Sequence, residues 1–231
     1  MKRLIVQLTL LIALLLGGDL SSQTTLNTRA WQLSVVQADA GRVDYNAATG
    51  KAAFDRRGAD GYVDVWTSGL DGTSMVCLTC DHPDLTVPNK HMGQPAWTHD
   101  GAFVLFQKQV GTCADADAVV GTGGCNDLWV IDAGGVDAFV LYTVAAGPNG
   151  ALLHAQLNAT DTKVFFSERT VASPSAWRLV VCDIEFVGTP STSGCVTAAP
   201  GDADGFYESH QCLDATCNTV LFSCLCDLAD D

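Results

Sequence analysis

The chain has 231 residues, of which 26 are acidic and 12 are basic, so its formal net charge is −14. This balance argues against nucleic acid or an anionic membrane as the partner, because both require a basic face. It is compatible with cation binding, a basic partner or a saline habitat, and a solvated acidic surface explains it most simply.

At the N-terminus, two basic residues precede an apolar run over residues 4–16, and small and polar residues follow. This order is typical of a secretory signal peptide. The alternative, a membrane anchor, is disfavoured because the run is too short to cross a hydrocarbon core of ~30 Å. The sequence therefore predicts a signal peptide over residues 1–22, an N-terminal segment over 23–41, and a secreted or periplasmic protein without a membrane span.

Four segments align without gaps and share one pattern: a strand, a tight turn and a second strand. Three of them read QPAWTHDGAFVLF, HAQLNATDTKVFF and HQCLDATCNTVLF, beginning at Gln94, His154 and His210, and a weaker first copy spans residues 42–54. Each segment ends in a phenylalanine, and these phenylalanines are 52 to 60 residues apart. A repeat of this period with strand signals alone is typical of β-propeller blades.

The other half of each unit repeats as well. Residues 64–79 and 127–142 match without gaps, and residues 177–183 begin a third copy with a longer hairpin loop. The Asp-Gly and Gly-Gly turns supply the positive φ that tight hairpins need. One unit is therefore four antiparallel strands. The sequence predicts an all-β fold, a partial and open β-propeller, and a β-sandwich is the weaker alternative.

The propeller region is expected over residues 42–231, with blades at about 42–79, 94–143 and 154–197 and a half blade at 206–226. A closed propeller typically has four to eight blades. The few residues after Ser223 are too short for the second hairpin of the fourth blade. The sequence therefore indicates a truncated propeller, or a ring that another chain completes. Uncovered blade faces and edges favour self-association.

The motifs QPAWTHDG, DLWVID and LDGTS with CLT resemble the TolB-like repeat, the Pro-Asp relative of the WD-type blade. The resemblance covers about residues 42–223 and is specific for the fold. It implies a binding or scaffolding module, although propellers host unrelated activities. Thr-Asp at 160–161 and Ala-Thr at 215–216 stand where the repeat has Asp-Gly, so blades three and four depart from the pattern.

All ten cysteines lie beyond the predicted signal peptide and fall in local pairs. An even count in a secreted chain predicts disulfides. The candidate pairs are Cys77–Cys80, Cys113–Cys125, Cys182–Cys195 and Cys212–Cys217. The second and third pairs bracket single loops, and closing loops of that length contributes ~3 kcal/mol in the chain-entropy account. Cys224 and Cys226 are too close to bridge easily, so their pairing stays open.

The segment from Cys77 to His82 reads CLTCDH and invites three functional interpretations. A redox motif would need a helix N-terminus to lower the thiol pKa, whereas a strand leads into this segment. A haem-attachment motif fails because Asp81 separates Cys80 from His82. A zinc site lacks a second Cys-x-x-Cys at usable spacing. A small disulfide loop at a strand end is the plainest interpretation.

Gln94, His154 and His210 occupy the same position in three repeats, with His91 and Glu208 near the same rim. In a propeller the first strand of each blade lines the central channel, so equivalent positions form a ring at one depth. This ring could hydrogen-bond a polar ligand, or bind a divalent metal through His154 and His210. Alternatively, these side chains hydrogen-bond neighbouring blades and water.

Two main functional hypotheses follow. The first is a non-catalytic secreted module that binds or scaffolds a protein or carbohydrate partner. The second is a carbohydrate-active lyase or hydrolase with a histidine-lined, metal-binding channel. The column of Gln94, His154 and His210 loosely resembles the metal site in the channel of some propeller polysaccharide lyases. A third is the propeller part of a serine peptidase that has lost its catalytic domain. Within this chain a Ser-His-Asp triad is not supported, because there is no Gly-x-Ser-x-Gly.

Overall fold

The computed structural model describes residues 40–85, 91–110, 126–144, 150–169, 177–202, 207–212 and 220–224, and from residue 199 onward it describes the backbone. The chain divides into two units, residues 1–35 and 36–231, and every described residue belongs to the second. These residues form β-strands and contain no helix. The predicted all-β class is confirmed.

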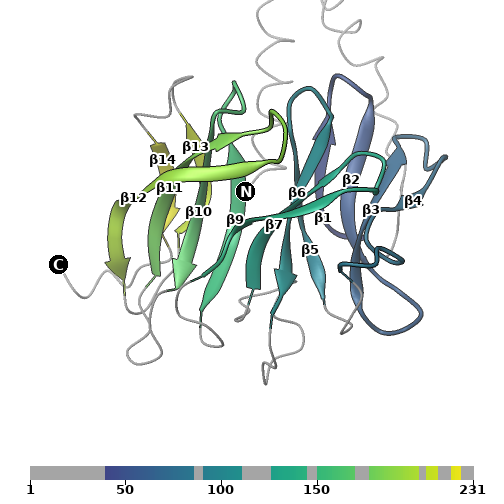
Figure 1. The fold of residues 1–231 in the computed structure, drawn as a ribbon, viewed down its shortest axis with the longest axis horizontal. Coiled ribbons are helices and arrows are strands. Elements are labelled where there is room, and N and C mark those ends of the chain that lie inside the picture. The colour runs from purple at the N-terminus through teal and green to yellow at the C-terminus, as the bar shows by residue number, and fades with distance from the viewer. Residues whose placement is uncertain are drawn as a thin grey trace, which may run out of the picture. The chain divides into compact units, whose positions relative to one another are not determined.

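The strands form three four-stranded sheets and one two-stranded sheet (Figure 1). The first sheet contains β1 (Ala40–Asn46), β2 (Lys51–Arg57), β3 (Val63–Gly69) and β4 (Val76–Cys77). The second contains β5 (Met92–Trp97), β6 (Phe103–Gln109), β7 (Asn126–Asp132) and β8 (Ala138–Tyr142). The third contains β9 (Ala151–Leu157), β10 (Lys163–Arg169), β11 (Trp177–Glu185) and β12 (Ser191–Asp202). The last contains β13 (Tyr207–Cys212) and β14 (Val220–Cys224).

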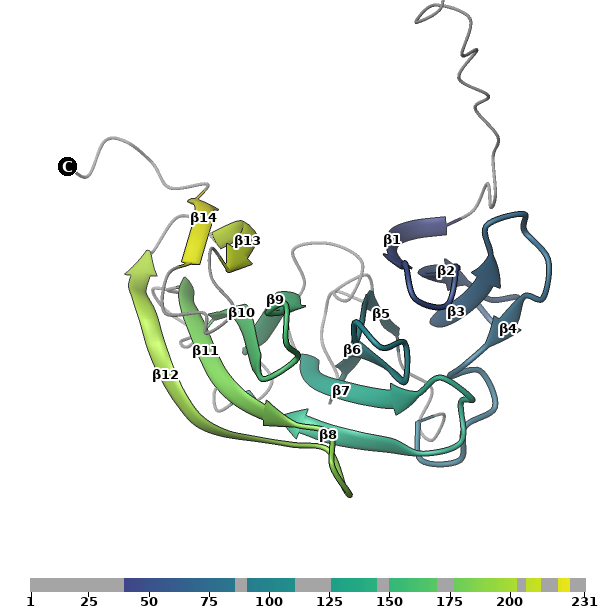
Figure 2. The same ribbon diagram turned by 90° about the horizontal axis from the view of Figure 1, so that it is seen from above.

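Strand order in every sheet follows the chain, and all paired strands are antiparallel. The three four-stranded sheets are called blades one, two and three here. Figure 2 shows them side by side, with β1, β5, β9 and β13 on the inner side of an arc and β4, β8 and β12 on its outer side. This is the arrangement of a partial, open β-propeller, as the repeat predicts.

Blades pack face to face, so their central strands are buried on both sides. In β6 every residue except Phe103 is buried, although the strand carries Gln107, Lys108 and Gln109. One apolar cluster joins blades one and two, and it includes Val65, Leu78, Trp97, Val104 and Phe106. A second cluster joins blades two and three, and it includes Leu105, Leu128, Leu152, Val164 and Phe166.

A buried carboxylate of blade three is paired within that blade and also accepts a hydrogen bond from blade two. Glu168 on β10 is 1% exposed. Its Oε2 accepts hydrogen bonds from Nε of Arg178 at 2.8 Å and from Nη2 at 2.7 Å. The hydroxyl of Tyr142 on β8 donates to Oε1 at 3.1 Å, across the blade boundary. Burial and the Glu168 carboxylate both raise the pKa of Tyr142 above its ordinary value. The Glu168 side chain therefore has both a charged partner and a neutral partner.

Each inner strand contains a β-bulge within one residue of the same place in the repeat. The pairing with the next strand shifts between residues 40 and 43 in β1, 93 and 96 in β5, 153 and 156 in β9, and 208 and 211 in β13. Gln94 and His154 lie within these bulges with φ values of 55° and 56°. Positive φ is uncommon for such residues, and a bulge redirects the side chains that it carries.

Two of the candidate disulfides are present, Cys77–Cys80 and Cys182–Cys195. Their Cα–Cα distances are 5.7 Å and 4.0 Å. Two other predicted pairs, Cys113–Cys125 and Cys212–Cys217, each contain at least one cysteine outside the described residues. Cys226 also lies outside them. A membrane-spanning helix, of sufficient length and apolar character, is not found in the part of the chain that the structure describes.

Candidate functional site

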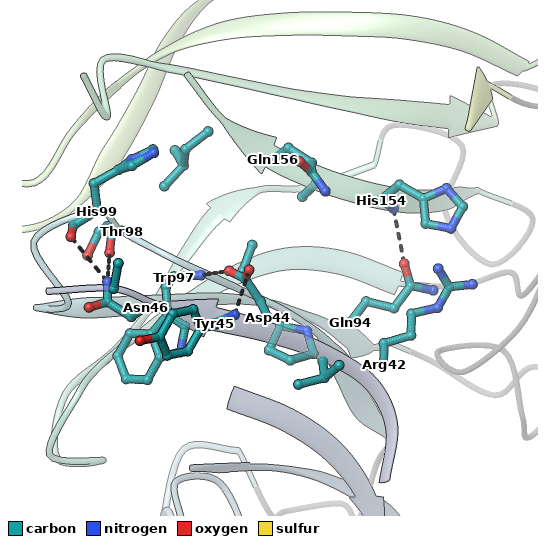
Figure 3. Close-up of a pocket in the computed structure, with 16 residues that line it drawn as sticks. Arg42, Asp44, Tyr45, Asn46, Gln94, Trp97, Thr98, His99, His154 and Gln156 are labelled. Atoms are coloured by element: carbon teal, nitrogen blue, oxygen red, sulfur yellow. Dashed lines mark hydrogen bonds between the residues drawn. The ribbon is translucent and has the colours of Figure 1, made fainter. Parts of the chain in front are cut away.

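The inner strands β1, β5 and β9 line a pocket of about 480 Å³ (Figure 3). The lining residues fall in three segments, 42–47, 94–99 and 154–157, one from each blade. These segments occupy corresponding places in the repeat, because the first strand of every blade faces the inner side of the arc. The pocket is therefore built by the repeat itself.

Arg42, Gln94 and His154 form one end of the pocket, as Figure 3 shows. They hold the same repeat position in blades one, two and three. Arg42 is exposed, His154 is half-buried and Gln94 is 4% exposed. The structure thus brings two residues of the predicted column together and adds a guanidinium beside them.

The Gln94 carboxamide belongs to a chain of hydrogen-bonded amides between blades two and three. Its Oε1 accepts from the backbone N–H of His154 at 3.0 Å and from Nε2 of Gln107 at 2.6 Å. Gln107 Oε1 accepts from Nδ2 of Asn126 at 3.0 Å, and Asn126 Oδ1 accepts from the N–H of Leu152 at 2.5 Å. To act as a metal ligand, Gln94 Oε1 would have to give up bonds that hold two blades together.

Asp55 plays the corresponding part between blades one and two. It directly follows the repeat phenylalanine of blade one, as Gln107 does in blade two. Its carboxylate accepts from the N–H of Arg42 at 2.7 Å and from the N–H of Gln94 at 2.9 Å. Burial raises the pKa of Asp55 above its ordinary value, although these N–H groups and the Arg42 charge oppose the change. A Cβ at Gly93 would lie 2.9 Å from Asp55 Oδ2, so the close approach requires glycine.

Backbone groups and a surface ion pair organise the other end of the pocket. Asn46 Nδ2 donates to the carbonyls of Thr98 at 2.8 Å and His99 at 3.1 Å. His99 Nδ1 lies 2.6 Å from Asp161 Oδ1, and the His99 N–H donates to Asp161 Oδ2 at 2.7 Å. Asp161 has a φ of 53° in the turn of blade three. The turns of blades two and three are thus held together above the pocket.

The pocket contains one carboxylate, Asp44, and the backbone satisfies both of its oxygens. Oδ1 accepts from the N–H of Tyr45 at 2.9 Å and Oδ2 from the N–H of Trp97 at 2.7 Å. The lining also contains one permanent cation, Arg42, and the imidazoles of His99 and His154. The pocket therefore offers a guanidinium and two imidazoles beside a carboxylate whose oxygens are already hydrogen-bonded.

Of the other predicted site residues, His91 does not line the pocket. His91 is 3% exposed, its Nδ1 accepts from the N–H of Val63 at 3.2 Å, and its ring centroid lies 5.1 Å from that of Tyr62. His91 thus contacts blade one. Glu208 and His210 lie on β13, whose backbone is described, and His210 falls within the β13 bulge.

Among the described residues, one group of three has metal-ligating atoms close together: Asp64, Cys77 and Cys80, within 4.8 Å of one another. The two sulfurs are bonded to each other, so they offer no thiolates. The Cys-x-x-Cys segment is a disulfide loop in this structure.

The sequence matches no protein-family model, and no curated protein sequence is significantly similar to it. Among solved structures, the blades superpose on TolB from Acinetobacter baumannii with a TM-score of 0.52 and 14% identity. That match covers 78% of this chain and 38% of TolB. The fold is that of a TolB-like β-propeller.

Two peptidases share weaker likeness with this TolB-like propeller. Prolyl oligopeptidase B from Galerina marginata gives a TM-score of 0.45 at 13% identity, over 73% of this chain and 24% of that one. The tricorn protease gives 0.47 at 13% identity, over 82% and 21%. These scores are too low to support an argument. The chain spans less than two fifths of the length of the TolB structure, so the likeness concerns the fold alone.

Several residues that line the pocket of the TolB-like propeller were not predicted as site residues from the sequence. Arg42 could have been found, because the weak first repeat places it in register with Gln94 and His154. Tyr45 and His99 had no such signal, since their contribution depends on the curvature that brings neighbouring inner strands together. Asp55 looked like an ordinary surface residue in sequence, yet it is 1% exposed.

Proposed function

We propose that the chain is a secreted, non-catalytic binding module that takes a polar ligand in the pocket formed by β1, β5 and β9. The pocket itself is the observation that supports this proposal. Its volume of about 480 Å³ falls within the range of small-ligand sites. Arg42, Tyr45, His99 and Gln156 are exposed in it, while the buried Gln94 and Asp55 hold the strands in place.

The chemistry of the lining favours a ligand with an acidic group. Arg42 is a permanent cation with a planar set of donors, suited to a carboxylate. Asp44, the carboxylate of the pocket, already accepts two N–H bonds, so it opposes an anion less than an unsatisfied carboxylate would. Acidic sugars and acidic peptides share this chemistry, and both agree with the predicted carbohydrate or protein partner.

Secretion is part of the proposal. The basic and apolar start of the chain is typical of a signal peptide. The disulfides Cys77–Cys80 and Cys182–Cys195 support an oxidising compartment, outside the cell or in the periplasm.

Calorimetric titration of the whole secreted chain tests the binding proposal. Two probes, a tetrasaccharide of uronic acids and a glutamate-rich peptide, are each compared with a neutral counterpart. We expect one acidic probe to bind and Arg42→Ala to weaken it by roughly tenfold, as loss of a charge-assisted hydrogen bond implies.

Lys51→Ala is the matched control. The substitution removes one positive charge, as Arg42→Ala does, but Lys51 is exposed on β2 and does not line the pocket. Its affinity should equal that of the unaltered chain. Binding of neither acidic probe, or an equal loss in Lys51→Ala and Arg42→Ala, would contradict the proposed site.

The alternative is a carbohydrate-active lyase or hydrolase with a divalent metal at His154 and His210. The position of His154 in the pocket favours it, and the two bonds accepted by Gln94 Oε1 disfavour Gln94 as a third ligand. Titration with Mn²⁺, Zn²⁺ and Ca²⁺ distinguishes the two proposals. Binding that disappears in a His154→Ala, His210→Ala variant supports the metal site, and equal behaviour of both proteins argues against it.

A further inference from the structure

The disulfide Cys77–Cys80 closes the turn that follows β4, outside the pocket. Only three positions separate the two cysteines, whereas thirteen separate Cys182 from Cys195. Closing so short a loop removes less chain entropy than closing a longer one. Cys77 and Cys80 are both partly exposed, whereas Cys195 is exposed and its partner Cys182 is buried, so an external thiol can approach either disulfide. Stability alone therefore explains Cys77–Cys80 less well than it explains Cys182–Cys195.

Three polar groups surround this disulfide, and one of them is the carbonyl oxygen of Val65, 3.7 Å from Cys77 Sγ. The backbone N–H of Cys80 donates to Sγ of Cys77 at 3.1 Å. A carboxylate oxygen of Asp64 and the two sulfurs all lie within 4.8 Å of one another. Within the described residues no comparable cluster includes Cys182 or Cys195. The N–H is positioned to stabilise a thiolate on Cys77, the role that a helix N-terminus has elsewhere.

Asp64 is buried at 5% exposure, on the strand next to the disulfide. The hydroxyl of Thr79 donates to its Oδ1 at 2.8 Å. Burial raises the pKa of Asp64; the Thr79 hydroxyl lowers it, and the nearby charges of Asp60 and Asp81 raise it. A carboxyl group shifted in this direction keeps its proton to higher pH, which is the property of a general acid or base.

We propose that Cys77–Cys80 is a redox-active disulfide that exchanges with an external dithiol, and that Asp64 donates and accepts the proton. A thiolate of the dithiol attacks Cys80 Sγ. The Cys77–Cys80 bond breaks and its electron pair passes to Cys77 Sγ, beside the Cys80 N–H. The second thiol of the dithiol then loses its proton, attacks its own partner sulfur and releases Cys80 as a thiolate.

The carboxyl of Asp64 protonates Cys80 and regains a proton from solvent, and Cys77 takes its proton from solvent as pH allows. In total, one S–S bond breaks in the protein and one forms in the dithiol. Two electrons and two protons move from the dithiol to the cysteine pair. The reverse reaction oxidises a dithiol substrate when a disulfide reoxidises the pair.

The surrounding structure can keep the loop in place when the bond opens. His82 Nε2 lies 3.0 Å from the carbonyl of Val136, in the β7–β8 turn of blade two. A Cβ at Gly135 in the same turn would lie 3.2 Å from the carbonyl of Leu78, so the two loops are in close contact. The Leu78 N–H also donates to the carbonyl of Val65 at 2.9 Å. These contacts do not depend on the disulfide.

Reduction of the whole chain by dithiothreitol, followed by alkylation and peptide mass spectrometry, tests this proposal. Each disulfide is followed separately in the same sample. We expect Cys77–Cys80 to be reduced at least about tenfold faster than Cys182–Cys195, because the Cys80 N–H stabilises the leaving thiolate on Cys77. This comparison uses the unaltered protein. Equal rates for the two disulfides would overturn the proposal.

The role of Asp64 is tested by Asp64→Asn, with Asp60→Asn as the matched control. Both changes remove one negative charge near the disulfide, but only Asp64 belongs to the cluster. We expect Asp64→Asn to slow reduction several-fold and to flatten its dependence on pH, while Asp60→Asn retains the profile of the unaltered chain. If the two variants behave alike, Asp64 has no proton-transfer role.

Discussion

The contact between blades one and two and the contact between blades two and three use corresponding positions with different chemistry. In the first, the Asp55 carboxylate accepts the N–H groups of Arg42 and Gln94. In the second, neutral amides make the equivalent connection, with Gln94 Oε1 accepting the N–H of His154. The backbone N–H groups at the bulges can thus be bonded by a carboxylate or by a neutral amide oxygen. Of these two acceptors, only the carboxylate titrates, so its hydrogen bonds depend on pH.

The second contact has its charges elsewhere. Glu168 and Arg178 pair within blade three, between β10 and β11, and neither lines the pocket. Tyr142 of blade two reaches this pair through its hydroxyl. Blade one places its buried carboxylate directly behind Arg42, whereas blade three keeps its ion pair apart from His154. The comparison suggests which substitutions should affect one contact and spare the other.

The largest effect is expected from Arg178→Met. It would leave the buried Glu168 carboxylate without its cation, and breaking such a pair from one side costs about 3–5 kcal/mol. Tyr142→Phe, which removes the neutral partner, should cost about 1 kcal/mol. Urea unfolding followed by tryptophan fluorescence measures both. Equal losses in the two variants would show that the charge adds nothing to the contact between blades two and three.

Asp55→Asn should weaken the contact between blades one and two. An amide offers one oxygen, so one of the N–H groups of Arg42 and Gln94 loses its acceptor, at a cost of about 1–3 kcal/mol. The same urea experiment applies, with the exposed Asp60→Asn as the control. The comparison fails if Asp55→Asn and Asp60→Asn are equally stable.

A dependence on pH should distinguish the two contacts more finely. Burial raises the pKa of Asp55, Asp64 and Asp127, so the folded chain binds their protons more tightly than the unfolded chain does. The free energy of unfolding should therefore fall as pH rises from the ordinary carboxyl range through the raised values. Asp100 and Asp132 have a lowered pKa and oppose this trend at lower pH.

Asp55→Asn should reduce that fall, and Gln107→Glu, which places a carboxyl at the matching position of blade two, should increase it. Unfolding midpoints measured at intervals from acidic to neutral pH test the prediction. A curve for Asp55→Asn parallel to that of the unaltered chain would show that Asp55 does not titrate differently in the two states.

His99→Ala should have the smallest effect. The His99–Asp161 pair joins the turns of blades two and three at the surface, and exposed pairs of this kind contribute about 0.2–1 kcal/mol. The backbone N–H of His99 keeps its hydrogen bond to Asp161 in this variant, so the loss should stay small. A loss well above about 1 kcal/mol would show that the His99 side chain itself supports the contact between blades two and three.

Much of the fold follows from the sequence because its determinants are local. Turn dipeptides and runs such as AFVLF report hairpins directly, and their recurrence reports blades. The register of the repeat also placed Gln94 and His154 on inner strands. In contrast, both ends of the amide chain depend on contacts between blades, since Gln94 Oε1 accepts the N–H of His154 and Asn126 Oδ1 accepts the N–H of Leu152. The buried Asp55 likewise accepts the N–H of Gln94 in the next blade. Those contacts join residues from different repeats, so no local pattern announces them.

The repeated bulge has a consequence for the history of the molecule. A register shift lies within one residue of the same repeat position in β1, β5, β9 and β13, and Gln94 and His154 share a positive φ there. Duplication of one bulged hairpin accounts for this agreement. The side chain at that place then diverged to Arg42, Gln94, His154 and His210 without disturbing strand pairing. The backbone of this position is therefore common to the repeats, and its side chain can change with the ligand while strand pairing is kept.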